Sequence, residues 1–174
     1  MTKVLLYGVG AARTVAFVVC LAVFGVSANS VAAPVGPFAE FPGAWSGDGT
    51  ITLAGGDKER LRCRAAYRVD SANAMNLVLS LGCASDNYKF DFTGEARADD
   101  QGSITGRWTE TSRSVGGGIV GRARADRIQV LIESSAFSAD LLMMTRAGRQ
   151  SVTIQLRSAG ETSSASMTLR RQPR

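Results

Sequence analysis

The feature that most constrains the fold is a pair of alternating apolar and polar runs, residues 60–69 and 77–83, on either side of Asn73. Such alternation is typical of a β-strand with one buried face. Folding the runs onto each other about Asn73 sets Cys63 opposite Cys83, and the neighbouring pairs on that face are all apolar. These pairs are Ala65 with Leu81, Tyr67 with Leu79 and Val69 with Leu77. Because a shift of one residue would break every match, the sequence predicts an antiparallel hairpin in this register.

The N-terminal segment has the pattern of a secretion signal. Residues 14–26 form a nearly continuous apolar run that follows Lys3 and Arg13 and precedes several small residues. The run is shorter than the roughly 20 apolar residues that cross a bilayer, and it suits a cleaved signal peptide. We therefore expect a signal peptide over residues 1–32, with cleavage after Ala28 as the alternative, and a single domain over residues 33–174. A retained membrane-anchoring helix is the competing interpretation.

Export has a direct consequence for the cysteines. Cys20 leaves with the signal peptide, so only Cys63 and Cys83 remain in the mature chain. In a periplasmic or secreted protein, which meets an oxidising environment, the two are expected to form a disulfide. Closing a loop of about 20 residues contributes roughly 3 kcal/mol on the chain-entropy model. We place the bridge on the buried face of the hairpin, and a bridge between non-neighbouring strands is the alternative.

The remaining residues repeat the same alternation, and a helical period is nowhere sustained. Short apolar-polar runs follow one another at intervals of roughly 10 to 15 residues, separated by turn-forming residues such as those of 99–102. This succession predicts eight to ten strands. The expected fold class is all-β, an antiparallel up-and-down barrel. An outer-membrane barrel is disfavoured, because aromatic residues make up only 7% of the chain.

Two short segments carry resemblances to known proteins. Gly43-Ala44-Trp45 at the start of the first expected strand resembles the calycin superfamily, which includes lipocalins, avidins and small periplasmic inhibitors. That resemblance implies an up-and-down barrel in which Trp45 plugs one end. Trp45-Ser46-Gly47 and the segment Glu59–Arg64 also resemble exported bacterial proteins, which implies export and a shared fold but supplies no activity.

The composition removes several kinds of chemistry. The chain contains no histidine, which excludes the commonest general base and the commonest metal ligand. The glycine-rich residues 114–118 lead into no helix and lack the lysine of a phosphate-binding loop. We therefore expect no cofactor, no metal and no enzymatic activity. A hydrolase that works through carboxylates is the alternative, because acidic residues such as Glu110 are scattered through the chain.

The leading functional hypothesis is a binding protein of the bacterial envelope. One version holds a small apolar ligand inside the barrel. The residues expected to line that site are Trp45, Tyr67, Leu79, Phe90 and Trp108. For the two tryptophans, a purely structural place in the core is the alternative. The other version binds a macromolecule at the rim of the barrel, as periplasmic hydrolase inhibitors of similar build do.

A row of arginines is the second candidate site. Arg60, Arg62, Arg64 and Arg68 share one face of the first strand of the hairpin. The mature chain holds 18 basic and 15 acidic residues, a net charge of +3. The row therefore suits an anionic envelope component, with a solvated barrel exterior as the alternative. Nucleic acid is disfavoured because no aromatic residues interleave on this face. No feature of the sequence indicates an oligomeric state.

Overall fold

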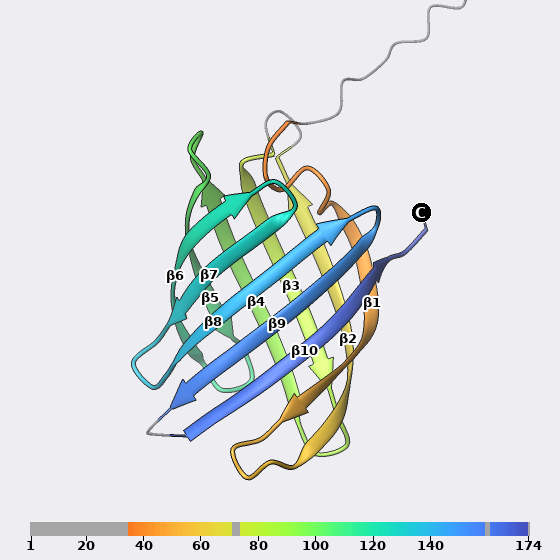
Figure 1. Cartoon of the computed structure of the whole chain (residues 1–174), viewed down its shortest axis with the longest axis vertical. Helices are drawn as coiled ribbons and strands as arrows, with labels where there is room; N and C mark the ends of the chain where they lie inside the picture. Colours follow the sequence, from red (N-terminus) through yellow and green to blue (C-terminus); the bar gives the residue numbers. More distant parts are fainter. Residues whose placement is uncertain (1–34, 71–73, 159–160, 174) are drawn as a thin grey trace, which may run out of the picture. The chain divides into compact units, whose positions relative to one another are not determined.

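The fold is described from a computed structural model of the chain, over residues 35–70, 74–158 and 161–173. The chain divides into two compact units, Met1–Val31 and Ala32–Arg174. The first unit, and with it most of the predicted signal peptide, lies outside the described residues. In the second unit the described residues form ten strands (Figure 1). They are β1 (Gly43–Thr52), β2 (Lys58–Val69), β3 (Asn76–Ala84), β4 (Lys89–Ala98), β5 (Ser103–Glu110), β6 (Val115–Arg124), β7 (Arg127–Glu133), β8 (Ser138–Arg146), β9 (Arg149–Ser158) and β10 (Glu161–Arg171).

The strands form one closed antiparallel barrel, which confirms the predicted fold class. Each strand pairs with the next in the sequence, and β1 pairs with β10 to close the ring. Closure brings two backbones very close at Gly47 of β1, where an added Cβ would lie 1.9 Å from the carbonyl oxygen of Thr168 on β10. Only glycine fits so close an approach. The pairing of β1 with β10 that closes the barrel therefore depends on the glycines of β1.

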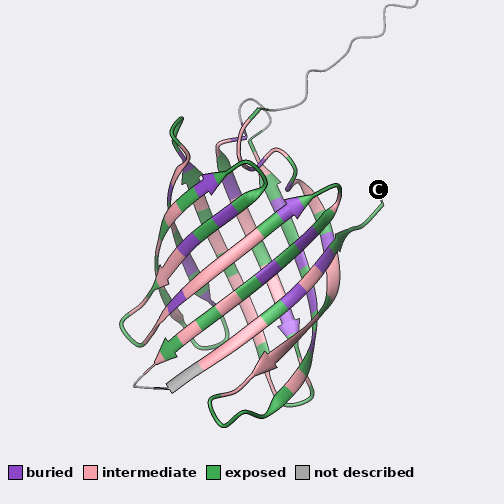
Figure 2. Cartoon of the chain, in the orientation of Figure 1, coloured by how far each residue is buried: buried purple, intermediate pink, exposed green. Residues whose placement is uncertain are grey.

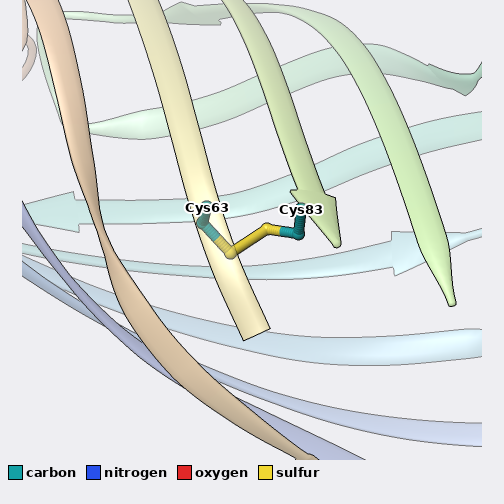
Figure 3. Close-up of a disulfide and its surroundings, with 2 residues drawn as sticks. All are labelled: Cys63 and Cys83. Carbon is teal, nitrogen blue, oxygen red and sulfur yellow. A yellow bond between two sulfur atoms is a disulfide. The ribbon is translucent and has the colours of Figure 1, made fainter. Parts of the chain in front are cut away.

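The β2–β3 hairpin has the register that the sequence predicted. Cys63 lies opposite Cys83, and the three apolar pairs that follow are in place. A disulfide joins the two cysteines, whose Cα atoms are 4.1 Å apart. Figure 3 shows the bridge spanning these two adjacent strands. Both cysteines are buried, so the disulfide lies on the inner face of the barrel wall.

The two ends of the barrel differ in how they are filled. The segment 35–42 precedes β1 and bends over the end at which β1 begins (Figure 1). From this segment Phe38 and Phe41 pack edge to face, with ring centroids 5.7 Å apart, and Phe41 packs in the same way on Tyr67. Trp45 is 1% exposed and donates its indole N–H to the Phe41 carbonyl at 2.8 Å. We call this the plugged end, and the opposite end the open end.

Candidate functional site

The barrel encloses a cavity of about 190 Å³ between its two ends. Its wall presents only apolar surface, supplied mainly by inward side chains of β3–β9. Phe38, Phe41 and Tyr67 form its floor at the plugged end, and Trp108 and Phe137 lie toward the open end. An engineered cavity of about 150 Å³ is large enough to bind benzene. The space therefore suits a compact apolar molecule.

On β3, β7 and β9, several inward apolar side chains toward the open end are less buried than those near the plugged end. On β9, Gln150 and Val152 near the plugged end are buried, whereas Ile154 and Leu156 toward the open end are partly exposed (Figure 2). The same change occurs on β3 (Leu77, then Leu79 and Leu81) and on β7 (Ile128 and Val130, then Ile132). Because these side chains face inward, solvent reaches them through the cavity. The cavity therefore opens toward the open end.

Three of the five predicted lining residues border the cavity. They are Tyr67, Leu79 and Trp108. The other two, Trp45 and Phe90, do not line it. Trp45 packs behind Tyr67, with ring centroids 6.1 Å apart, so it belongs to the plug. Phe90 lies nearer the rim of the open end.

A buried polar relay stiffens the wall behind the floor of the cavity. The Tyr67 hydroxyl donates a hydrogen bond to Gln150 Oε1 at 2.6 Å, and Gln150 Nε2 donates to Thr145 Oγ1 at 3.0 Å. Gln150 is completely buried. Burial raises the pKa of the Tyr67 hydroxyl, so this group stays protonated. The hydroxyl of Tyr67 is thus engaged with Gln150, while Tyr67 itself lines the cavity.

A row of aromatic rings runs inward from the rim of the open end. Tyr88 stacks on Phe90 and Phe90 on Phe92, each pair with centroids 6.2 Å apart, and Phe92 contacts Trp108. Phe137, from the β8 side, completes the row at 5.4 Å from Trp108. The alternation of β4 could have identified Phe92, which shares the parity of Phe90. Phe137 lies in a turn, where alternation gives no signal.

Glu110 organises the rim beside this aromatic row. Its carboxylate accepts hydrogen bonds from the backbone N–H of Asp91 at 3.1 Å and of Arg113 at 2.7 Å, and from the backbone N–H and hydroxyl of Ser112. The Ser112 hydroxyl and these backbone donors lower the pKa of Glu110 to about 2. The Arg113 guanidinium lies 3.6 Å from Glu110 and 5.2 Å from the Phe90 ring centroid. Glu110 therefore serves as a charged anchor for the 111–114 turn.

Glu59 plays a similar part on the other side of the same rim. It accepts hydrogen bonds from the Ser85 hydroxyl at 2.6 Å and from Asn87 Nδ2 at 2.8 Å. These side-chain bonds lower the pKa of its carboxyl. Glu59 and Glu110 are thus both engaged in holding turns, and a lowered pKa does not suit a general acid. These two carboxylates therefore do not suit the general acid of the carboxylate hydrolase that the sequence left as an alternative.

The predicted arginine row lies on the outer face of β2. Arg60, Arg62, Arg64 and Arg68 are all exposed. Arg60 pairs with Asp48 at 3.2 Å, and Arg62 lies 3.9 Å from Asp86. Two of the four charges are therefore partly balanced by neighbouring carboxylates. Anion binding by this row stays a prediction.

Two other kinds of site are absent from the described part of the chain. No group of three or more cysteine, aspartate or glutamate side chains there is arranged to hold a metal ion. Among the same residues, no helix is long and apolar enough to span a membrane.

Comparison with known proteins identifies the fold. No protein-family model and no curated sequence matches the chain. Among solved structures, Rv2717c from M. tuberculosis is similar, with a TM-score of 0.62 and 15% identity over 79% of this chain and 94% of that one. The S-type phycobiliprotein lyase CPES from Guillardia theta is similar with a TM-score of 0.60 and 9% identity, over 79% of this chain and 91% of that one.

At such low identity these likenesses show the fold alone. That fold agrees with the calycin-like barrel that the sequence resembles. They also correct one expectation. The sequence led us to expect no enzymatic activity, yet a barrel of the same architecture is named as a lyase. A barrel of this build is therefore no argument against catalysis. The chain is a ten-stranded, calycin-like barrel with an apolar interior cavity.

Proposed function

We propose that the barrel binds a small apolar molecule in its interior, entering from the open end. The observation that carries this proposal is the cavity of about 190 Å³, whose wall is apolar throughout. Protein interiors are normally packed to the density of organic crystals. A void of this size, lined by partly exposed leucine and isoleucine, leaves apolar surface that a ligand would remove from water.

The size and chemistry of the cavity narrow the ligand class. The volume exceeds the roughly 150 Å³ that takes benzene and is below the roughly 300 Å³ of drug-sized pockets. The Tyr67 hydroxyl at the floor already donates to Gln150. Recognition would therefore come from shape and apolar area. A single ring or a short alkyl chain fits this description best.

The disulfide suggests where this binding takes place. Cys63 and Cys83 are bonded on the inner wall of the barrel, and structural disulfides persist in oxidising compartments. Together with the apolar N-terminal run of residues 14–26, this supports a periplasmic or secreted protein. The ligand would then be a molecule that reaches the cell envelope.

The proposal can be tested by filling the cavity. Leu141 on β8 lines the cavity, whereas its neighbour Leu142 has the opposite parity and points outward. In Leu141→Trp the indole would occupy the ligand space, and Leu142→Trp adds the same group to the outer face. Toluene binding to the full chain would be measured by calorimetric titration. The proposal expects wild type and Leu142→Trp to bind toluene alike, and Leu141→Trp to bind at least tenfold more weakly.

Two outcomes would overturn the proposal: no toluene binding by wild type, or equal binding by both tryptophan variants. Near-ultraviolet circular dichroism of each variant checks that the barrel is intact. If Leu141→Trp does not fold, Ile154→Phe is the substitute, because Ile154 lines the cavity from the adjacent strand β9. Native mass spectrometry of protein purified from its own cells would then identify any retained molecule.

A further inference from the structure

A cluster of arginines lies outside the site described so far, on the outer face of β6–β10 beside the plugged end. This face is turned toward the viewer in Figure 1. Its members are all exposed. Four of them flank the β6–β7 and β8–β9 turns, and the fifth lies near the end of β10. The arginine cluster consists of Arg124, Arg127, Arg146, Arg149 and Arg170.

The strand register sets these like charges directly against one another. Arg124 on β6 is opposite Arg127 on β7. Arg149 on β9 is opposite both Arg146 on β8 and Arg170 on β10. Residues directly opposite have Cβ atoms about 4.5–5.5 Å apart, and like charges in such pairs are destabilising. The fold therefore tolerates a concentration of positive charge here that its own stability does not favour.

Acidic side chains do little to balance this charge. The ion pairs recorded within the described residues involve Arg60, Arg62, Lys89, Arg113 and Arg157, and none involves the arginine cluster. Two carboxylates are close to it along the chain or through the backbone: Asp126 lies in the β6–β7 turn, and Glu40 accepts a hydrogen bond from the Ala147 backbone N–H at 3.1 Å. Neither carboxylate forms one of the recorded ion pairs, so the five guanidinium groups lack a salt-bridge partner among the described residues.

The same face exposes apolar side chains. Met144, directly opposite Arg127, is 44% exposed, and Val120 on β6 is 46% exposed. They are two of the three large apolar residues most exposed in the described part of the chain. Leu131 and Leu142 share their outward parity and are partly exposed. The outer surface of β6–β8 thus combines unbalanced guanidinium groups with accessible apolar groups.

We propose that this face binds the surface of an anionic phospholipid membrane. Guanidinium groups pair with phosphate oxygens as a fork, and basic residues near an anionic leaflet are attracted to its surface potential. Met144 and Val120 would enter the apolar edge of the headgroup region. A soluble acidic polymer would use the arginines equally well but would leave these apolar groups in water, so the observations favour the membrane.

The experiment measures co-sedimentation of the full chain with vesicles of phosphatidylcholine containing 30% phosphatidylglycerol, and with vesicles of pure phosphatidylcholine. The test variant removes one row of the cluster, Arg146→Gln/Arg149→Gln/Arg170→Gln. The matched control, Arg60→Gln/Arg62→Gln/Arg64→Gln, removes the same charge from the outer face of β2. We expect wild type to bind the anionic vesicles at least tenfold more tightly than the neutral ones, and the test variant to lose at least tenfold in affinity. The control variant should stay within threefold of wild type, because Arg60 and Arg62 already lie beside Asp48 and Asp86.

Several results would overturn the proposal. Equal binding of wild type to both kinds of vesicle would show that the arginines are not responsible. An equal loss in both triple variants would show a response to net charge alone, and a larger loss in the control would move the site to β2. Binding of wild type to dextran sulfate without binding to anionic vesicles would assign the cluster to a soluble polyanion. Thermal unfolding of each variant confirms that the barrel remains folded.

Discussion

The two ends of the barrel are held together by different interactions. At the plugged end, Phe38, Phe41 and Trp45 interlock with almost no exposed surface, and Gln150 links β9 to Tyr67. Toward the open end, inward side chains of β3, β7 and β9 are partly exposed, and the strands are held by the disulfide, by Glu110 and by surface ion pairs. Packing thus supports one end, and polar and covalent links support the other. A barrel organised in this way can keep a cavity open without losing its stability.

The largest effect expected from this contrast is at the plug. Phe41→Ala removes a ring that packs on two others and leaves a space that the rigid barrel cannot fill, so we expect a loss of about 3–5 kcal/mol in the free energy of unfolding. Phe137→Ala removes the same ring from the half-buried open end and should cost less than about 2 kcal/mol. Urea unfolding of the two variants gives the comparison. Equal losses would contradict the distinction between the ends.

A smaller and pH-dependent effect is expected at Glu110. Its carboxyl has a pKa of about 2 in the folded protein against 4.5 ordinarily, so its charged form stabilises the fold above pH 4.5. This contribution is lost as the pH falls from 4.5 through 2. In Glu110→Gln it should be absent, so the urea midpoints of wild type and variant should differ at pH 7 and converge near pH 2. A difference that does not change with pH would contradict the role of the charge.

The smallest effect is expected in the arginine cluster. Arg149 is flanked on both sides by an opposed arginine, so Arg149→Gln should raise the free energy of unfolding by up to about 0.5 kcal/mol. Arg60→Gln instead removes an exposed ion pair with Asp48 and should leave stability unchanged or lower it by a few tenths of a kcal/mol. Thermal unfolding at low ionic strength gives the sign of each change. A stabilising effect in both variants would point to net charge alone.

The hairpin and the barrel could be predicted from the sequence because strand alternation is a local property. The parity of Cys63 and Cys83 already specified which face they share, and the pairing in the structure is the one that parity required. The same reasoning assigned Tyr67, Leu79 and Trp108 to the interior. Alternation distinguishes only two directions, inward and outward, and for these residues that information was sufficient.

Alternation does not give the height of a residue along the barrel axis. Trp45 and Phe90 face inward, yet one belongs to the plug and the other lies near the rim, so neither lines the cavity. Their heights follow from strand tilt and from the stagger between neighbouring strands, which closure of the ring sets. Phe38 and Phe41 also form the floor of the cavity from a segment that precedes the first strand, where no periodic pattern indicates it.

The two groups of arginines also differ in whether the sequence alone reveals them. Those of β2 follow one another at every second position, so the sequence displays them as a row, whereas the arginine cluster is spread from Arg124 to Arg170. The sequence by itself determined the β-strands, the inward or outward direction of their side chains and the cysteine pairing, because these depend on neighbouring residues along one chain. Only the closed barrel decided which end is filled, where the cavity lies and which charges lack a partner. Those properties depend on the register between strands, and ring closure sets that register for all ten together.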